Sequence, residues 1–285
     1  GVISGIKKSG KYDTCYGAIN GILGILNERY LNLSQMIPDE KTLNRLKVTP
    51  AMYLGSCRHK LPDYKDDDSA YVFIFNQFAK LNIKAFFYIG GNDSMDTVLK
   101  LSDYAAKIKS DIRIIGVPKT IDNDLCMIDH TPGFGSAAKY IASTMLEIAH
   151  DTFIYAVKSV TIVEIMGRHC SDLTISAGIA GGCEYIVASE MEFNREELIR
   201  QIERSIIRGK RHAIIAITEL ITDVHSLARE IEARVGHETR ATVLGHIQRG
   251  GSPCAFDRIL ASRMGVYAVD ILLQGKGGYC VGIQN

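Results

Sequence analysis

The sequence has little net charge, no cysteine pairs at metal-site spacing and no long apolar segments. It has 33 Lys and Arg residues against 32 Asp and Glu, so no strong global field attracts nucleic acid or a membrane surface. Its seven cysteines are scattered and include no CxxC pair, which argues against a disulfide framework or a zinc site and fits a reducing cytosol. No segment has the length and hydrophobicity of a membrane span, and no signal peptide is visible. We expect a cytoplasmic protein that binds neither nucleic acid nor a membrane.

The composition is that of an ordinary globular protein. Hydrophobic residues make up 46% and charged residues 23% of the chain. The 285 residues are enough for one large domain or two ordinary ones. No internal repeat or low-complexity tract is present. Information on function must therefore come from the local motifs.

Short apolar runs of strand length alternate with amphipathic segments of helical period. The expected strands cover residues 14–17, 85–89, 112–115, 157–165, 184–187, 213–217 and part of 238–251. The expected helices cover residues 70–81, 95–108, 195–208, 224–234 and 257–273, with another ending near 148. This alternation predicts an α/β protein with mostly parallel sheets covered by helices on both faces. Each half of the chain, divided near Pro132, carries its own strands, so we expect two lobes with a cleft between them.

The stretch from Gly116 to Asp124 follows a buried apolar run and carries the densest set of reactive groups. Lys119, Thr120, Asp122 and Asp124 lie within six positions. In open α/β sheets, chemistry is found on loops beyond the carboxyl ends of strands. One carboxylate here could take a proton from a substrate hydroxyl, and a second could hold a metal. The alternative is a surface turn, because Asp, Asn, Gly and Pro are turn residues.

A second loop, Gly90 to Ser94, joins an apolar strand to an amphipathic helix. A strand, a Gly-Gly loop and a helix N-terminus together form a cradle for phosphate. Asp93 would be unfavourable beside a bare phosphate unless a metal lay between them. The alternative is an ordinary strand–helix turn in which Ser94 is the N-cap.

One Gly-Ser turn and two further strand ends carry charged side chains. Arg58 follows a Gly-Ser turn and could fork onto a phosphate. Arg168 lies just past the strand 157–165, where it could neutralise charge on a transferring phosphoryl group. Glu219 follows the strand 213–217. Taken singly, each could equally be an ordinary loop residue.

A third cluster contains Arg240, His246 and Arg249, which fall within ten residues around one strand and its exit loop. Three such donors, if they converged, would bind a dianionic phosphate. The Gly250–Pro253 turn beside them favours a shaped loop. The alternative is scattered surface charge.

Four of these motifs together resemble the phosphofructokinase family in order and spacing. They are Gly90–Ser94, Pro118–Asp124, Met166–Arg168 and Gly245–Gly251. The resemblance runs over nearly the whole chain, and from residue 166 onward it is very close to the bacterial ATP-dependent enzymes. It also implies that the family's opening strand lies before residue 1 and its last helices after residue 285.

The resemblance implies the phosphofructokinase fold. This is an α/β architecture of two Rossmann-like, three-layer αβα lobes with mostly parallel sheets and an active-site cleft between them. Residues 1–133 plus 248–285 would form the lobe that binds the phosphoryl donor. Residues 134–247 would form the lobe that binds fructose 6-phosphate.

The implied reaction is phosphorylation of the 1-hydroxyl of fructose 6-phosphate to fructose 1,6-bisphosphate in glycolysis, with Mg²⁺. By resemblance Asp122 is the general base, and Thr120 and Asp124 position the transferring group and the metal. Arg58 and Arg168 match arginines that neutralise charge on the phosphoryl group. Phosphoryl transfer depends mostly on positioning and charge stabilisation, so this apparatus is what the reaction needs.

The remaining site residues also follow from the resemblance. Those implied to bind the substrate are Thr120, Asp122, Asp124, Met166, Gly167, Arg168, Glu219, Arg240, His246 and Arg249. Those implied to bind the donor are Gly91, Asn92, Asp93, Ser94, Arg58 and Lys119, with Lys119 also catalytic. Those implied to hold the metal are Asp93, Asn92 and Asp124. Arg240 would come from a neighbouring subunit, which implies a homodimer or homotetramer.

Three departures from the family pattern bear on the donor and the sugar. Asp93 and Lys119 stand where the ATP users have Gly, and together they match the pyrophosphate-dependent branch. An Asp side chain would fill and repel the space of a nucleotide's α-phosphate, whereas Lys119 can pair with pyrophosphate, so we favour pyrophosphate as the donor. Asn92 replaces a usual metal-side Asp, whose role Asp93 could take over. Ser159 replaces an arginine that many ATP users place on the 6-phosphate.

Three alternatives remain open on the sequence alone. The first is an ATP-dependent 6-phosphofructokinase that tolerates Asp93. The second is a non-catalytic sugar-phosphate-binding or regulatory subunit, although such a subunit has no physical need for the base Asp122. The third is a different acceptor, because sedoheptulose 7-phosphate also presents a 1-hydroxyl beside a ketose.

Overall fold

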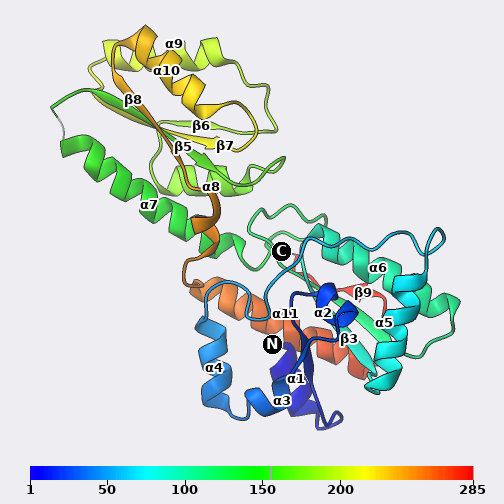
Figure 1. The fold of residues 1–285 in the computed structure, drawn as a ribbon. Coiled ribbons are helices and arrows are strands. Elements are labelled where there is room, and N and C mark those ends of the chain that lie inside the picture. Colours follow the sequence, from blue (N-terminus) through cyan, green and yellow to red (C-terminus); the bar gives the residue numbers. More distant parts are fainter. Residues whose placement is uncertain (155, 285) are drawn as a thin grey trace. The chain divides into compact units, whose positions relative to one another are not determined.

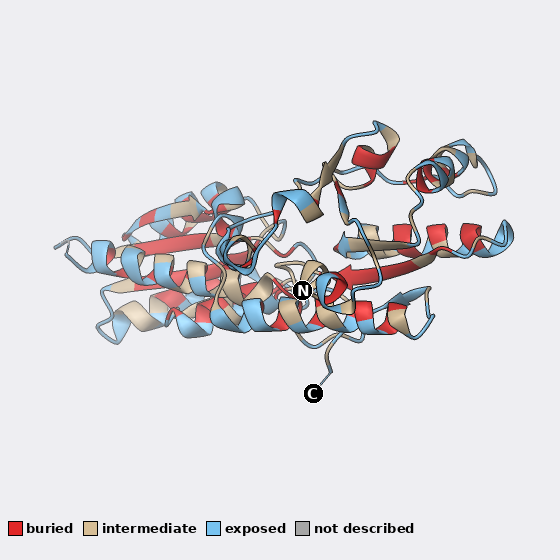
Figure 2. Ribbon diagram, turned by 90° about the horizontal axis from the view of Figure 1, so that it is seen from below, coloured by how far each residue is buried: buried red, intermediate tan, exposed pale blue. Residues whose placement is uncertain are grey.

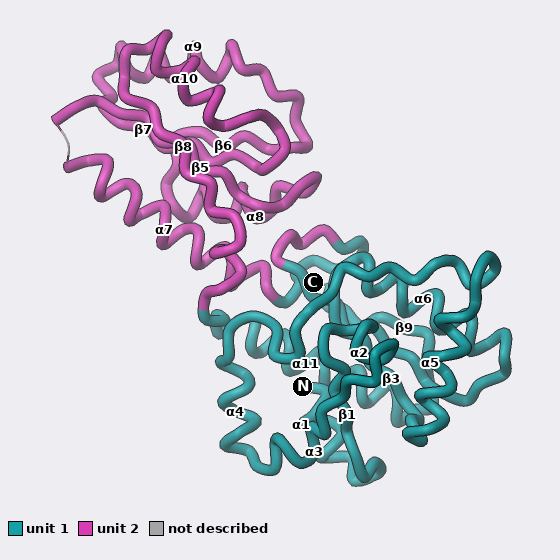
Figure 3. Tube along the Cα trace, viewed as in Figure 1, with its two compact units in different colours: residues 1–120, 125–132, 252–285 teal, residues 121–124, 133–251 magenta. Residues whose placement is uncertain are grey.

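The computed structural model describes residues 1–154 and 156–284, which divide into two units (Figure 3). Unit 1 comprises Gly1–Thr120, Leu125–Pro132 and Ser252–Asn285, and unit 2 comprises Ile121–Asp124 and Gly133–Gly251. The expected lobes differ from these units at three places. The expected first lobe includes residues 121–124, Gly133 and residues 248–251, whereas all three belong to unit 2. Asp122 therefore belongs to unit 2. The charged side chains that shift its pKa belong to the same unit.

Unit 1 is built on a three-stranded parallel sheet with the strand order β3-β4-β9, together with an antiparallel pair, β1-β2 (Figure 1). Its elements are α1 (Val2–Ser9), β1 (Tyr16–Ala18), α2 (Ile22–Leu26), β2 (Tyr30–Asn32), α3 (Leu33–Met36), α4 (Glu40–Val48), α5 (Ser69–Lys80), β3 (Ala85–Gly90), α6 (Asn92–Lys107), β4 (Arg113–Pro118), α11 (Ala255–Leu273) and β9 (Tyr279–Cys280).

Alternation along β4 places helices on both faces of the unit 1 sheet. Ile114 packs into a core with residues of α5 and α6. Ile115 and Val117 pack into a second core with residues of α11 and α1. Successive side chains of a strand point to opposite faces, so one strand supplies both cores. Of these strands, β4 is mostly buried, β3 is mostly half-buried and β9 is exposed. Figure 2 colours the ribbon by burial, with buried residues in red.

The structure corrects the expected end of β4. We expected the strand to stop at Ile115 because Gly and Pro follow, but it continues through Gly116 to Pro118. A Cβ at Gly116 would lie 2.6 Å from Cys280 Sγ and 2.7 Å from Met95 Sδ. The glycine therefore allows close packing inside the strand rather than a turn, which is a known use of glycine in sheets.

Unit 2 contains a four-stranded parallel sheet with the order β6-β7-β5-β8. Its elements are α7 (Phe134–Ile154), β5 (Ser159–Ile165), α8 (Asp172–Ala180), β6 (Tyr185–Val187), α9 (Arg195–Ile207), β7 (His212–Thr218), α10 (Val224–Val235), β8 (Glu238–Val243) and the 3₁₀ helix η1 (Gly245–Arg249). Val160 and Ile162 pack against α9 and α10 on one face. Val163 and Ile165 pack with α7 and α8 on the other. The expected α/β fold with mostly parallel sheets is confirmed.

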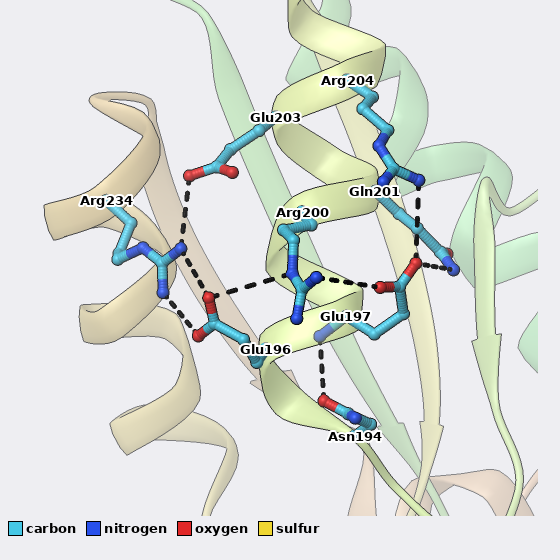
Figure 4. Close-up of polar contacts among 8 residues, drawn as sticks. All are labelled: Asn194, Glu196, Glu197, Arg200, Gln201, Glu203, Arg204 and Arg234. Carbon is cyan, nitrogen blue, oxygen red and sulfur yellow. Dashed lines mark hydrogen bonds and ion pairs between the residues drawn. The ribbon is translucent and has the colours of Figure 1, made fainter.

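Helices α9 and α10 are also joined by an ion-pair network on their surface (Figure 4). The Arg234 guanidinium lies 2.7 Å from Glu196 and 3.5 Å from Glu203. Within α9, Arg200 Nε lies 4.0 Å from Glu196 Oε1, one helical turn away. The Asn194 side chain accepts a hydrogen bond from Glu197 N and caps α9. Exposed ion pairs add little stability each, so the apolar core, not this network, fixes the two helices.

Candidate active site

In unit 2, three neighbouring parallel strands end at the same edge of the sheet. Ile165 is paired with Thr218 in the β5–β7 register, and Glu164 with Val243 in the β5–β8 register. The residues that follow these strand ends include Met166, Gly167, Arg168 and Glu219, and η1 with His246 and Arg249 follows β8 after one further residue. The fold thus brings most of the sugar-site residues implied by the resemblance to one edge.

Asp122 is the half-buried carboxylate of this edge. Burial raises the pKa of Asp122, and the nearby carboxylates of Asp124 and Glu219 raise this pKa further. The guanidinium groups of Arg168 and Arg249 act in the opposite direction. The five side chains thus form one electrostatically coupled group within unit 2. A carboxylate with a raised pKa is a better proton acceptor in a catalytic step than an ordinary exposed aspartate.

The segment that carries Asp122 is tied to α8. Asn123 has a left-handed backbone with φ of 58°, a conformation that asparagine tolerates better than most residues. Its side-chain amide donates a 2.8 Å hydrogen bond to Asp172 Oδ2 in the first turn of α8. This bond helps explain why residues 121–124 belong to unit 2.

The loop after β5 depends on a glycine. Gly167 has φ of 148° and Arg168 has φ of 54°. A Cβ at Gly167 would lie 2.3 Å from the Cys170 carbonyl oxygen, so only glycine fits. Gly167 N donates to Glu219 Oε1 at 3.3 Å, and Cys170 N donates to the Gly167 carbonyl at 3.0 Å. The tight turn places Arg168 beside the end of β7.

Gln248 is a buried residue that sequence reasoning missed. It is 2% exposed, accepts a hydrogen bond from Met166 N at 3.2 Å and donates to the Gly245 carbonyl at 2.9 Å. It therefore joins η1, which carries His246 and Arg249, to the end of β5. The only sequence signal was a glutamine between the apolar Ile247 and Arg249.

Arg240 lies apart from this group. It is in the body of β8, paired with Thr161 in the register, whereas His246 and Arg249 follow the strand's carboxyl end. Its guanidinium lies 2.6 Å from Glu238 Oε1. With Asp151 and Ser159 it lines an open cavity of about 340 Å³. Arg240 therefore comes from a different stretch of the chain than His246 and Arg249, before rather than after the end of β8.

In unit 1, β3 and β4 also end side by side, with Gly90 paired with Pro118. Lys119 N donates to the Gly90 carbonyl at 2.9 Å. The two predicted donor loops, Gly91–Ser94 and Lys119–Thr120, therefore begin at neighbouring points of one sheet edge.

The structure corrects the alternative assignment of Ser94 as a helix cap. Helix α6 begins at Asn92 and its N-cap is Gly91, so Ser94 lies inside the first turn. The Ser94 side chain instead bonds the Tyr88 hydroxyl, which also accepts from Ile22 N at 3.3 Å. A serine near the start of this helix is therefore not its N-cap, because Gly91 occupies that position.

Asp93 forms an ion pair with Lys60 at 2.8 Å, and the two side chains are 68% and 69% exposed. Lys60 follows the predicted donor residue Arg58 by two positions, and Arg58 is itself exposed. Sequence reasoning did not single out Lys60, because a lysine in a polar loop carries no distinguishing signal. The pair means that the negative charge of Asp93 is partly compensated in unit 1.

The Mg²⁺ ion that the resemblance implies does not need a site made of protein ligands alone. Among residues 1–154 and 156–284, no group of three or more His, Cys, Asp or Glu side chains is arranged to hold a metal. Mg²⁺ is usually bound through one or two carboxylates plus substrate phosphates and water. Within unit 1, Asp93 and Asn92 carry oxygen atoms of this kind, and within unit 2 Asp124 does so. In the same described part of the chain, no helix has the length and hydrophobicity of a membrane span.

Comparison with known proteins agrees with this geometry. The phosphofructokinase family profile matches residues 2–272. The chain is 56% identical over 279 residues to an ATP-dependent 6-phosphofructokinase of Haemophilus influenzae (strain PittEE), covering 95% of this chain and 79% of the relative. It is 54% identical over 270 residues to the protein of the same name from Histophilus somni (strain 2336), with the same coverage.

Solved structures give the same family. The pyrophosphate-dependent phosphofructokinase from Marinobacter aquaeolei has a TM-score of 0.85 and 32% identity, covering 97% of this chain and 71% of that one. The enzyme of the same description from Nitrosospira multiformis has a TM-score of 0.86 and 30% identity, covering 97% and 72%. The relatives of higher identity are named ATP-dependent, so the expected preference for pyrophosphate is not confirmed. The profile match and the identities show that this chain belongs to the phosphofructokinase family.

Proposed function

We propose that this protein transfers the terminal phosphoryl group of ATP to the 1-hydroxyl of fructose 6-phosphate, in the cytoplasm and in glycolysis. The observation that carries the phosphotransferase part is the coupled group around Asp122. A half-buried carboxylate with a raised pKa interacts electrostatically with two arginines that follow the carboxyl ends of parallel strands. The name shared by the relatives at 56% and 54% identity supports ATP as the donor.

In the proposed reaction Asp122 acts as the general base. Its carboxylate takes the proton of the 1-hydroxyl as that oxygen attacks the terminal phosphorus. The new bond from the sugar oxygen to phosphorus forms while the bond from phosphorus to the leaving diphosphate oxygen breaks. Arg168 neutralises charge on the group in transit, which is where most of the catalytic effect of such enzymes arises. Arg58 and Lys119 serve the same purpose from unit 1, and Thr120 orients the transferring group.

The sugar is recognised by groups at the edge of unit 2. Glu219, held by the amide of Gly167, accepts hydrogen bonds from sugar hydroxyls, and Met166 supplies an apolar contact. His246 and Arg249 bind the 6-phosphate. Arg240, which lies in the body of β8, serves the corresponding site of a second copy, so we propose a homodimer or homotetramer.

Mg²⁺ would be held by Asp124, Asp93 and Asn92 together with the phosphates, and when bound it would neutralise phosphate charge. Gly91 and Ser94 are proposed to bring the N-terminus of α6 against the donor phosphates. The role of the protein's own side chains is then to bind, to orient and to accept one proton.

Pyrophosphate is the second candidate donor, and Asp93 with Lys119 carries it. An Asp side chain occupies space that a nucleotide's α-phosphate would need, and Lys119 offers a charge for a smaller anion. The ion pair of Asp93 with Lys60 reduces the repulsion between Asp93 and a nucleotide phosphate. We therefore give the ATP-dependent relatives more weight than Asp93 and Lys119 in proposing the donor.

The test is turnover by the full-length protein with Mg²⁺ and ATP, with fructose 6-phosphate and sedoheptulose 7-phosphate as parallel acceptors. Formation of fructose 1,6-bisphosphate at the higher kcat/KM supports the proposal. A higher kcat/KM with sedoheptulose 7-phosphate would make that sugar, rather than fructose 6-phosphate, the proposed acceptor. Binding of fructose 6-phosphate without turnover, with either ATP or pyrophosphate, would favour a non-catalytic regulatory subunit and overturn the proposal.

A further inference from the structure

A cluster of buried hydroxyl groups lies behind the strand ends of unit 2. Ser171 and Thr174 are 0% exposed and Thr218 is 1% exposed. Ser171 Oγ lies 2.8 Å from Thr218 Oγ1, which lies 2.9 Å from Thr174 Oγ1. Ser171 Oγ also lies 3.0 Å from Ser189 Oγ. Such a network is costly to bury unless its members satisfy one another.

Ser171 is the centre of this cluster. Besides the two hydroxyl contacts, Ser171 Oγ accepts a hydrogen bond from Ser189 N at 2.7 Å. A serine hydroxyl offers one donor and two acceptor positions, so three contacts use its full capacity. The Ser171 amide in turn donates to Glu190 Oε1 at 2.6 Å. Burial opposes ionisation of Glu190, but the bonds from Ser171 and Ser189 leave its pKa below the usual value.

These contacts join three segments that are separate in sequence. Ser171 ends the loop that follows β5, Thr218 is the last residue of β7, and Ser189 and Glu190 follow β6. Two residues of the proposed sugar site lie beside these anchor points. Arg168 is in the same loop as Ser171, and Glu219 directly follows Thr218. The loop that begins with the strained turn at Gly167 and Arg168 is therefore held at its other end by Ser171.

We infer that Ser171 is a positioning residue for the sugar-phosphate site. Its hydroxyl fixes the loop after β5 to the end of β7, and thereby fixes the Arg168 guanidinium relative to the Glu219 carboxylate. This inference rests on the proposed function, because it is that function which makes Arg168 and Glu219 substrate contacts. A preorganised site loses affinity and rate when its supporting bonds are removed, even if no substrate contact is touched.

The test compares Ser171→Ala and Thr218→Val with the control Thr152→Val in full-length protein. Thr152 and Thr161 form another buried hydroxyl pair in unit 2, at 3.4 Å, and Thr161 lies near the start of β5. The control therefore removes a buried hydroxyl from the same unit away from the strand ends. Two independent variants are used because either alone could fold poorly.

We expect Ser171→Ala and Thr218→Val each to raise the KM for fructose 6-phosphate about tenfold. The KM for the donor should stay within about twofold, and Thr152→Val should change neither constant. The double variant should be no worse than the poorer single variant, because both remove the same coupling. An unchanged KM for fructose 6-phosphate in both single variants, with stability lowered as in Thr152→Val, would reduce the cluster to a structural role and overturn the inference.

Amide hydrogen exchange of the same proteins separates this inference from the proposed function. Ser171→Ala should speed exchange in residues 167–172 and 218–220, and Thr152→Val should not. If the wild type phosphorylates no sugar but this difference is seen, the proposed function fails and the positioning of the two loops stands. If exchange in these loops is the same in Ser171→Ala and Thr152→Val, the positioning role is wrong whatever the enzyme's activity.

Discussion

The sheet edges of the two units are built in different ways. At the edge of unit 2, loops are fixed by buried bonds from Gln248 and Ser171 and by a left-handed turn that only Gly167 allows. At the edge of unit 1, Asp93 pairs with Lys60 where both side chains are more than two-thirds exposed, and Lys119 is half-buried.

We propose that the rigid edge of unit 2 carries out the proton transfer, and that side chains at the edge of unit 1 select the phosphoryl donor. A proton acceptor and its charge partners must be held in fixed geometry, so their loops are bonded internally. Exposed loop side chains can change without disturbing a core. This explains how residues typical of one donor class, Asp93 and Lys119, occur in a chain whose named relatives use another. The predictions below test this contrast, beginning with the largest expected effect.

The contrast predicts that removing the base is the most damaging change. Asp122→Asn keeps the shape of the side chain but cannot accept the hydroxyl proton. We expect kcat to fall about 10²–10⁴-fold, the usual contribution of general base catalysis, with little change in the KM for fructose 6-phosphate. Steady-state assays with circular dichroism as a folding check would measure this. A loss smaller than tenfold would remove Asp122 from the base's role.

The turn at Gly167 should be nearly as sensitive. Gly167→Ala forces a Cβ to within 2.3 Å of the Cys170 carbonyl oxygen, so Arg168 must move. We expect the free energy of unfolding to fall by about 3 kcal/mol and kcat/KM to fall about a hundredfold. Gly182→Ala is the matched control: Gly182 also has positive φ, but a Cβ there meets no atom within 4 Å. It should cost about 1 kcal/mol with unchanged activity, and equal activity losses in the two variants would contradict the account.

Replacing the unit 1 residues should alter the donor rather than the chemistry. In Asp93→Gly/Lys119→Gly we expect the ratio of kcat/KM with ATP to kcat/KM with pyrophosphate to rise about tenfold, equivalent to about 1.4 kcal/mol, because the carboxylate that crowds a nucleotide and the lysine that suits the smaller anion are both removed. Any activity with pyrophosphate should fall, and the KM for fructose 6-phosphate should not change. An equal loss with both donors, which would leave the ratio unchanged, would show that these two positions do not select the donor.

The smallest effect should appear in the pH profile. Because burial and two carboxylates raise the pKa of Asp122, the base loses its charge at a higher pH than an ordinary aspartate. Activity should therefore begin to fall at a higher pH as the solution is acidified. Glu219→Gln removes one of the raising charges, so the acid limb of kcat/KM should move to lower pH. A shift to higher pH in this variant would contradict the assigned electrostatics.

Much of the fold could be predicted from the sequence because hydrophobic period and glycine loops are local signals. The strand 157–165 and the helix 195–208 were placed within two residues of β5 and α9. The continuation of β4 through Gly116 could not be predicted, because it depends on the pairing of residues 116–118 with β3.

Within the site, the motif residues could be recognised but their supports could not. Gln248 and Ser171 act through partners on other strands, and single-sequence reasoning has no access to such pairings. The packing of Asp122 with unit 2 is likewise a tertiary effect. The roles of the individual site residues remain predictions until the variants are measured.

The most direct test of the proposed donor is the rate of fructose 1,6-bisphosphate formation by the full-length wild type with Mg²⁺, measured with ATP and with pyrophosphate in turn. The account predicts the higher kcat/KM with ATP. Activity with pyrophosphate alone would contradict it and would show that Asp93 and Lys119, rather than overall similarity to the ATP-dependent relatives, determine the donor.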